Sequence, residues 1–364
     1  MSARAPEFET SQPDRAEIYA VARGIATAVA PSGGISGGQA SVLHAITLAL
    51  TGVDVEYRSL EPLAAADLAA VLERRGPEYR QRIVHHMVLG ELVLRPLPAE
   101  VANRVAEYAV ALGVDDHFVR VARRYAKGAF GLAWVDLRRS GFAERWDPSV
   151  PALHSKEGFA DPFENHGPDP ELEARWQAFA DLPAGTLGRA VSDMYLGRGF
   201  ALPGNPMGAP AFLAQHDFMH VLADYGTDLS GELEVFALVG RADPDPKGFA
   251  WLATMIGLFE TGYVAKAGFF ETDIRQPRLQ SPAMSTRLAD AVRRGKAMAE
   301  GYGVDLFLVD FHELADRDLD DVRAALQLPP KSPAALEAGS VSVFDLDGMS
   351  ESQREFAIAR ASRE

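Results

Sequence analysis

The chain of 364 residues contains no cysteine. Disulfide bonds, thiolate-bound metals and a cysteine nucleophile are therefore excluded, and any metal site must use histidine and carboxylate side chains. Positive charge is also scarce, because 36 lysines and arginines stand against 51 aspartates and glutamates and leave a formal net charge of −15. This acidic excess argues against a nucleic-acid partner and against electrostatic docking on anionic lipid.

Long apolar runs are missing as well. The longest one, from Phe249 to Phe259, is too short to span a bilayer. The stretch from Met1 to Asp14 contains acidic side chains and no apolar core, so we do not expect it to be a signal peptide. We therefore expect a cytoplasmic protein with at most peripheral contact with a membrane.

The composition that remains is typical of a globular protein, since 47% of the residues are hydrophobic and 24% are charged. The length is sufficient for two ordinary domains. Apolar residues recur at helical spacing and no alternating strand pattern stands out, which predicts an all-α fold. The expected parts are a helical bundle at 14–140, a linker or crossover at 141–169, a second helical domain at 170–330 and a loosely attached tail at 331–364.

Capping residues and helix breakers predict where the helices begin and end. Six helices are expected between Asp14 and Leu137, with Asp14 and Ser36 as the N-caps of the first two. In the second half, Thr186 and Ser230 are the expected caps of the helices that follow them. The third of the six N-terminal helices is expected at 62–75. The helices expected in the rest of the chain are 170–181, 187–198, 232–239, 249–269, 288–301, 318–326 and 351–361, with a further segment at 305–313.

One short stretch combines residues that suit a metal site. His216 and His220 are four residues apart, so on a helix they share one face, with Asp217 beside them and Glu232 after a loop. Two imidazoles and two carboxylates can bind a divalent metal, and zinc is the first expectation. Iron is the second, because two histidines and a carboxylate suit non-haem Fe(II). A His/Asp/Glu hydrogen-bond network without a metal is the alternative.

The residues of this stretch have different expected roles. His216, His220 and Glu232 would hold the metal, which could act as a Lewis acid. Asp217 could be a further ligand, a general base or a residue that orients one imidazole, so Asp217 and Glu232 are the candidate catalytic carboxylates. Glu234 competes with Glu232, but the two lie roughly 200° apart around a helix, so only one can face the histidines.

Other polar residues are expected to be structural. His85 and His86 are adjacent and point roughly 100° apart on a helix, so with Glu91 they do not suggest a second metal site. The Asp115-Asp116-His117 sequence is interpreted as the start of a helix, and His312 as a structural histidine. Glu260, within the apolar 249–269 segment, is either on a surface stripe or a partner in the metal site.

The motif also resembles a known family. The order His216-Asp217-x-x-His220, eleven residues, then Glu232 resembles the signature of the Coq-four family, named for a protein of coenzyme Q (ubiquinone) biosynthesis. The sequence from Leu182 to Arg189 resembles that family's LPxGTLG segment, and the sequence from Arg323 to Leu328 resembles its closing segment more loosely. The resemblance covers residues 170–330.

The resemblance implies a function that the spacing alone does not. It implies a zinc-type site at His216, Asp217, His220 and Glu232, and it selects Glu232 over Glu234. It also implies a metal-dependent enzyme of ubiquinone or related quinone biosynthesis that acts on a prenylated aromatic, lipid-like precursor, by oxidative decarboxylation at ring carbon 1, together with other biosynthetic enzymes. The alternatives are a non-catalytic, lipid-binding scaffold and a metal-dependent hydrolase, and a homo-oligomer is compatible with all three.

The N-terminal half resembles a second family. The sequence from Gly34 to Gln39, the apolar helix after it, and the sequence from Leu112 to Asp115 resemble the TerB-like helical domains, named for tellurite resistance. The resemblance implies a helical bundle and assigns no site residue in this chain.

Overall fold

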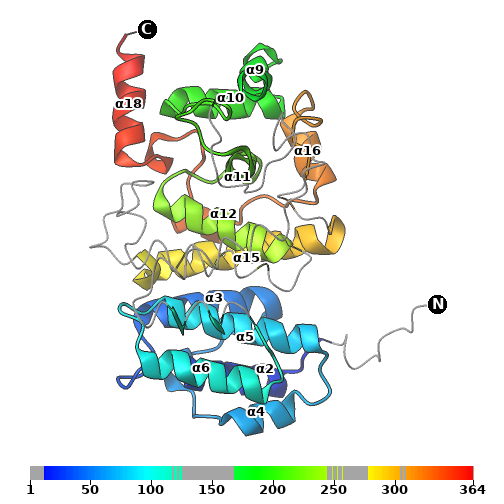
Figure 1. Cartoon of the computed structure of the whole chain (residues 1–364), viewed down its shortest axis with the longest axis vertical. Helices are drawn as coiled ribbons and strands as arrows, with labels where there is room; N and C mark the ends of the chain where they lie inside the picture. Colours follow the sequence, from blue (N-terminus) through cyan, green and yellow to red (C-terminus); the bar gives the residue numbers. More distant parts are fainter. Residues whose placement is uncertain are drawn as a thin grey trace, which may run out of the picture. The chain divides into compact units, whose positions relative to one another are not determined.

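The computed structural model describes residues 12–116, 119–120, 123–124, 168–243, 248, 252, 256, 278–303, 306 and 309–363. Within these ranges the regular elements are helices, and the β-pairing consists of an isolated bridge between Thr186 and Asp318, so the predicted all-α class is confirmed (Figure 1). The chain divides into two compact units. Unit 1 contains residues 1–141 and 245–293, and unit 2 contains residues 142–244 and 294–364.

Unit 1 is a bundle in which α2 packs against α5 and α6, and α3 packs against α5 and η7. The predicted caps of its first two helices are confirmed: Asp14 accepts a hydrogen bond from the backbone of Glu17, and Ser36 forms a capping box with Gln39. The helices are α2 (Arg15–Val29), α3 (Gly37–Thr51), η1 (Tyr57–Ser59), α4 (Ala65–Val71), α5 (Pro77–Leu92), α6 (Ala99–Ala111) and η7 (Arg278–Gln280).

A buried amide joins three of these helices. The side chain of Gln39 donates to the carbonyls of Val29 (2.8 Å) and Gly90 (3.0 Å), and so links α2, α3 and α5. Helix α4 is shorter than the predicted 62–75, because the chain leaves the helix after Val71 and the buried Arg75 pairs with Glu17 on α2 instead.

Unit 2 is built around α11, which lies between α10 and α12 and also contacts α16 (Figure 1). Helix α10 contacts α18 and η5 as well. The helices are α9 (Pro170–Gln177), η5 (Ala178–Asp181), α10 (Leu187–Arg198), α11 (Ala211–Ala223), α12 (Leu229–Ala242), α16 (Leu319–Ala325), α17 (Pro333–Glu337), η8 (Leu346–Gly348) and α18 (Glu351–Ala361). Helix α15 (Pro282–Gly301) has residues in both units.

The start of α10 is held by a second segment of the chain. The backbone of Leu187 donates to Arg317 (2.9 Å), and the backbone of Leu319 donates to Gly185 (2.9 Å). Thr186 precedes the helix as predicted, but its hydroxyl donates to the carbonyl of Pro183 and does not cap the helix, so that part of the prediction is wrong. The amide of Gly188, which a cap could bind, donates instead to the carbonyl of Ala315 at 2.8 Å.

The segment at 331–364 is not loosely attached, which corrects the expectation from its composition. The backbone amide of Thr227 donates to the carbonyl of Gly348 at 2.6 Å, and the hydroxyl of Thr227 donates to the side chain of Gln353 at 2.7 Å. Arg198, on α10, donates to the carbonyl of Val343. The last helix occupies the predicted residues, Glu351–Ala361.

Several predicted boundaries differ from those in the structure, and some predicted segments lie outside the described residues. Residues 245–293 group with unit 1, whereas we expected them in a domain at 170–330. Helix α15 begins six residues before the expected position, at Pro282, and residues 311–316 form turns where a helical segment was expected. The predicted helix at 249–269 with Glu260, the linker at 141–167 and most of the sixth helix with His117 lie outside the described residues.

Among the described residues, no helix is both long enough and apolar enough to cross a bilayer.

Candidate metal centre

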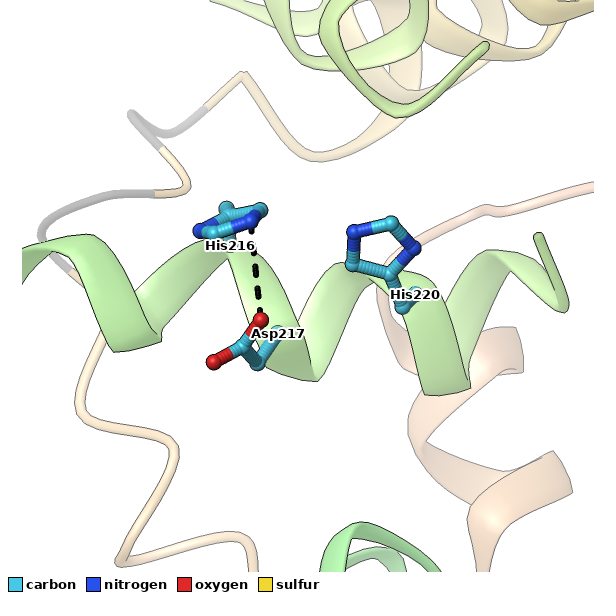
Figure 2. Close-up of side chains that lie close together, drawn as sticks. All are labelled: His216, Asp217 and His220. Carbon is cyan, nitrogen blue, oxygen red and sulfur yellow. Dashed lines mark ion pairs between the residues drawn. The ribbon is translucent and has the colours of Figure 1, made fainter. Parts of the chain in front are cut away.

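The two histidines, His216 and His220, lie on α11, a helix that is largely buried. Its neighbouring positions Phe218, Met219 and Leu222 are almost fully buried, so the helix is enclosed on most of its faces. The rings of His216 and His220 project from the same side of the helix, with their centroids 5.3 Å apart (Figure 2). The spacing of four residues therefore has the geometric consequence that the sequence predicts.

Three cationic side chains hold the C-terminal end of α11. Arg323 donates to the carbonyls of Leu222 (2.8 Å) and Val221 (3.1 Å), and Arg294 donates to that of Ala223 (2.9 Å). Lys331 donates to the carbonyl of the left-handed C-cap residue that follows. Positive charge at a helix C-terminus is favourable because it meets the negative end of the helix dipole. The histidines therefore lie on a helix that is anchored just beyond them.

A tight loop returns the chain to the histidines. Gly231 lies so close to the carbonyl of Gly226 that a Cβ atom at Gly231 would be 1.8 Å from that oxygen, so only glycine fits. Asp228 caps α12 by accepting from the backbone of Gly231 at 2.9 Å, and the predicted cap, Ser230, is instead within the helix. Glu232 consequently lies in the first turn of α12, as predicted, and is 4% exposed.

The four predicted residues come together in space. Nε2 of His220 lies 3.3 Å from Oε1 of Glu232, and Nε2 of His216 lies 3.6 Å from Oε2 of the same carboxylate. Nε2 of His216 is also 3.5 Å from Oδ1 of Asp217, the ion pair drawn in Figure 2. The charge of Glu234, the competing acid, acts on the Lys331 ammonium instead.

The donor set fits a bound cation. His216, Asp217 and His220 each offer one ligand atom, and these atoms lie within 4.8 Å of one another. Among the described residues, Nε2 of His220 and Oε2 of Glu232 are buried and make no hydrogen bond, and each has only an ion-pair contact, at 3.3 and 3.6 Å respectively. Such unsatisfied buried groups are costly unless they have a partner of another kind. A divalent cation between the imidazoles and the carboxylates would satisfy both atoms.

The charges of His220 and Glu232 stabilise each other. Burial lowers the pKa of His220, but Glu232, Asp217 and the Tyr225 carbonyl together outweigh burial and the net direction is upward. Burial raises the pKa of Glu232, but His220 and His216 together outweigh burial and the net direction is downward. Without a metal, the two groups therefore favour an imidazolium–carboxylate ion pair, which is the metal-free network considered from the sequence.

Two tyrosines that the sequence analysis did not select contact the site. Nδ1 of His220 lies 3.1 Å from the carbonyl oxygen of Tyr225, which fixes the ring so that Nε2 faces Glu232. The hydroxyl of Tyr195 donates to Oδ2 of Asp217 at 2.5 Å. Neither contact follows from a spacing rule, because the Tyr225 contact is made by a backbone carbonyl and the Tyr195 hydroxyl comes from a separate helix.

The polar residues of unit 1 form a different arrangement. Nε2 of His85 lies 2.8 Å from Oδ2 of Asp116, and Gln81 donates to the same oxygen at 2.9 Å. Asp116 is thus a buried partner of His85, a contact that its interpretation as a helix-start residue did not include. Glu91 is fully buried, and burial raises its pKa well above the usual range although Arg123 opposes this, so it favours the neutral acid.

His44, Ser285 and Asp54 in unit 1 lie in a row that resembles a catalytic triad, but their hydrogen bonds do not fit one. His44 lies between Ser285 (Nδ1 to Oγ, 3.3 Å) and Asp54 (Nε2 to Oδ1, 3.0 Å). The hydroxyl of Ser285 donates to the carbonyl of Ser41 at 3.0 Å, so its proton is not directed at the imidazole. A nucleophile activated by His44 would instead require the Ser285 hydroxyl to donate to Nδ1 of the imidazole.

Comparison of this chain with protein-family models, with curated proteins and with solved structures gives no match in any of the three.

Proposed function

We propose that the chain binds one divalent metal ion through His216, His220, Glu232 and Asp217, and that it is a Coq-four-like enzyme of ubiquinone or related quinone biosynthesis. The observation that carries this proposal is the convergence of these side chains from two helices, with two buried ligand atoms that have no hydrogen-bond partner among the described residues. The resemblance of the motif to the Coq-four signature supports the assignment to quinone chemistry.

The donor types favour zinc first and iron second, because imidazole nitrogen and carboxylate oxygen suit both ions. Either ion, when bound, would supply a Lewis acid toward a carboxylate or phenolate of the substrate. The protein would supply the fixed donors and an enclosed environment, since Glu232 and His220 are almost completely buried.

The side of His216 suits the approach of an aromatic substrate. The side chain of His216 is 15% exposed, whereas that of His220 is fully buried, so the site is more open at His216. Phe236 stacks on the His216 ring, with centroids 5.6 Å apart and an interplanar angle of 28°. An apolar ring beside the more exposed ligand favours a hydrophobic, prenylated aromatic compound over a small polar one.

The proposed conversion is the oxidative decarboxylation of a prenylated hydroxybenzoate, and it requires iron at the site because zinc does not exchange electrons with dioxygen. An aromatic carboxylic acid, dioxygen, two electrons from an external donor and two protons give a phenol, carbon dioxide and water. The carbon–carbon bond to the carboxyl group breaks, and a carbon–oxygen bond forms at the same ring carbon.

Release of labelled carbon dioxide tests the proposal. Metal-loaded protein, a reductant and a prenylated hydroxybenzoate labelled at its carboxyl carbon would be incubated in air. We expect release by the wild-type chain and loss of release in Glu232→Gln. Glu91→Gln is the matched control, because it makes the same change at a buried helical glutamate of unit 1 and should retain activity.

Two results would contradict the proposal: no release by the wild-type chain, or full release by Glu232→Gln. Absence of turnover together with retained binding of a biosynthetic enzyme would identify the chain as a scaffold.

A further inference from the structure

We infer that Tyr195 is a positioning residue of the metal centre: its hydroxyl holds one oxygen of Asp217 so that the other oxygen faces the metal. This inference rests on the proposed metal site and adds a residue that the motif does not contain. It also assigns Asp217 the role of ligand, among the roles that the sequence leaves open.

The two oxygens of Asp217 have separate partners. Oδ2 accepts the hydrogen bond from Tyr195 at 2.5 Å, and Oδ1 is the oxygen that lies 3.5 Å from Nε2 of His216. A carboxylate that is held at one oxygen has a fixed orientation at the other. Oδ1 is therefore presented to the space between the histidines. Because Oδ2 is bound by the tyrosine and Oδ1 faces His216, we assign Asp217 the role of ligand rather than of general base.

The hydroxyl of Tyr195 is itself held in place. The tyrosine is 2% exposed, and its ring packs against Trp176 (centroids 5.3 Å apart) and edge-on against Phe200 (5.5 Å). Packing on two sides leaves the ring little freedom to change rotamer. The orientation of Asp217 is thus determined by α10 as well as by its own helix.

The next turn of α10 supports the same site by a separate contact. Arg198, three residues after Tyr195, donates from Nε to the hydroxyl of Thr227 at 2.6 Å. Thr227 lies in the loop that leads to Glu232. One face of α10 therefore orients Asp217 directly and the Glu232 loop indirectly, which is why we assign the orienting function to this helix rather than to an isolated contact.

A double-mutant cycle on zinc affinity tests the inference. Zinc dissociation constants would be measured by competition with a chelator for wild type, Tyr195→Phe, Asp217→Ala and the double variant. Tyr57→Phe is the control, because it removes the hydroxyl of another buried tyrosine, which hydrogen-bonds Thr47 in unit 1. We expect Tyr195→Phe to weaken binding by about 10- to 100-fold and Tyr57→Phe to leave it unchanged.

The cycle separates positioning from general stabilisation. If Tyr195 acts through Asp217, Tyr195→Phe weakens binding in the wild-type background and has no further effect in Asp217→Ala. An equal loss in both backgrounds, or no loss in either, would overturn the inference. Wild-type protein that binds no zinc would overturn the proposed metal site as well, whereas zinc binding that is insensitive to Tyr195→Phe would overturn the inference alone.

If Tyr195→Phe does not fold, the tyrosine ultraviolet difference spectrum of the wild-type chain on zinc addition decides the question. The inference predicts a perturbed tyrosine band, because zinc withdraws charge from the carboxylate that accepts the Tyr195 hydrogen bond. An unperturbed tyrosine band on stoichiometric zinc binding would overturn it.

Discussion

Single side chains set the electrostatics of unit 2, and His312 shows this most clearly outside the metal centre. Its ring packs against Phe179 (centroids 4.8 Å apart) and edge-on against Trp176 (5.5 Å). Burial is the main cause that lowers its pKa to about 4; the charge of Arg175 acts in the same direction and that of Asp310 opposes it. His312 is therefore neutral in the folded chain at neutral pH, in agreement with a structural role.

This shift predicts a loss of stability in acid. The unfolded chain has the ordinary histidine pKa of 6.5, so the unfolded state binds a proton at His312 that the folded state does not bind until about pH 4. The contribution of the His312 pKa shift to the free energy of unfolding is complete above pH 6.5. It falls between pH 6.5 and 4, by about 3 kcal/mol for the full shift. Between pH 6.5 and 4, the unfolding free energy of wild type should fall by this amount relative to that of His312→Phe, which has no titrating group at this position. Parallel curves would contradict the prediction.

At this scale the sequence predicts the ligands but not the residues that orient them. His216, Asp217, His220 and Glu232 can be recognised because helix geometry and one loop length bring them together. The Tyr195–Asp217 contact depends on the packing of α10 against α11, which no local spacing encodes. The same limitation applies to Asp116, whose partner His85 lies 31 residues away in the sequence.

At the scale of elements, the position of α11 depends on the side chains that bind its last carbonyls. Arg323→Gln removes two hydrogen bonds to this helix end and a positive charge from the negative end of its dipole. We expect a loss of about 1–3 kcal/mol in the free energy of unfolding, since hydrogen bonds from a charged donor and the dipole each contribute at this level. Urea unfolding measures the difference.

Arg354→Gln is the matched control for this change. Arg354 is half-buried on α18, donates to the carbonyl of Leu346 at 3.2 Å and lies 3.8 Å from Asp347, so its contacts are within the C-terminal segment. Its removal should change stability by about 0.5 kcal/mol or less. Equal losses in the two variants would show that the anchoring of α11 has no special weight.

Helix limits are predicted well where a local signal decides them. The helices Leu187–Arg198 and Glu351–Ala361 have the expected bounds; the left-handed Gly199 ends the first, and Ser350 caps the start of the second. Helix α12 begins earlier than predicted, because Asp228 is a better cap than Ser230 in this loop, where Gly231 must approach Gly226. Tertiary contact, rather than propensity, decides that boundary.

At the scale of the whole molecule, the C-terminal segment belongs to unit 2 through specific polar contacts. Deleting 331–364 removes Lys331 from the end of α11 and takes away the partners of Thr227 and Arg198. We expect the truncated chain to unfold at a lower temperature and to bind zinc more weakly, whereas deletion of 362–364 alone should change neither. A truncated chain with wild-type melting temperature and zinc affinity would contradict this account.

The division into units is the feature that the sequence predicts least well. The failure of helical periodicity after residue 141 predicts a linker there, whereas residues 245–293 group with unit 1. Hydrophobic periodicity reports which face of a helix is buried and not which neighbour buries it, so a returning segment cannot be recognised from its own pattern.

Elemental analysis of protein purified without added metal tests the central claim most directly. It would compare the wild-type chain with the His216→Ala/Glu232→Ala double variant, with circular dichroism to verify that both are helical. The account predicts about one zinc or iron ion per wild-type chain and none in the variant. Absence of metal from the wild-type chain, or the same metal content in both, would contradict it.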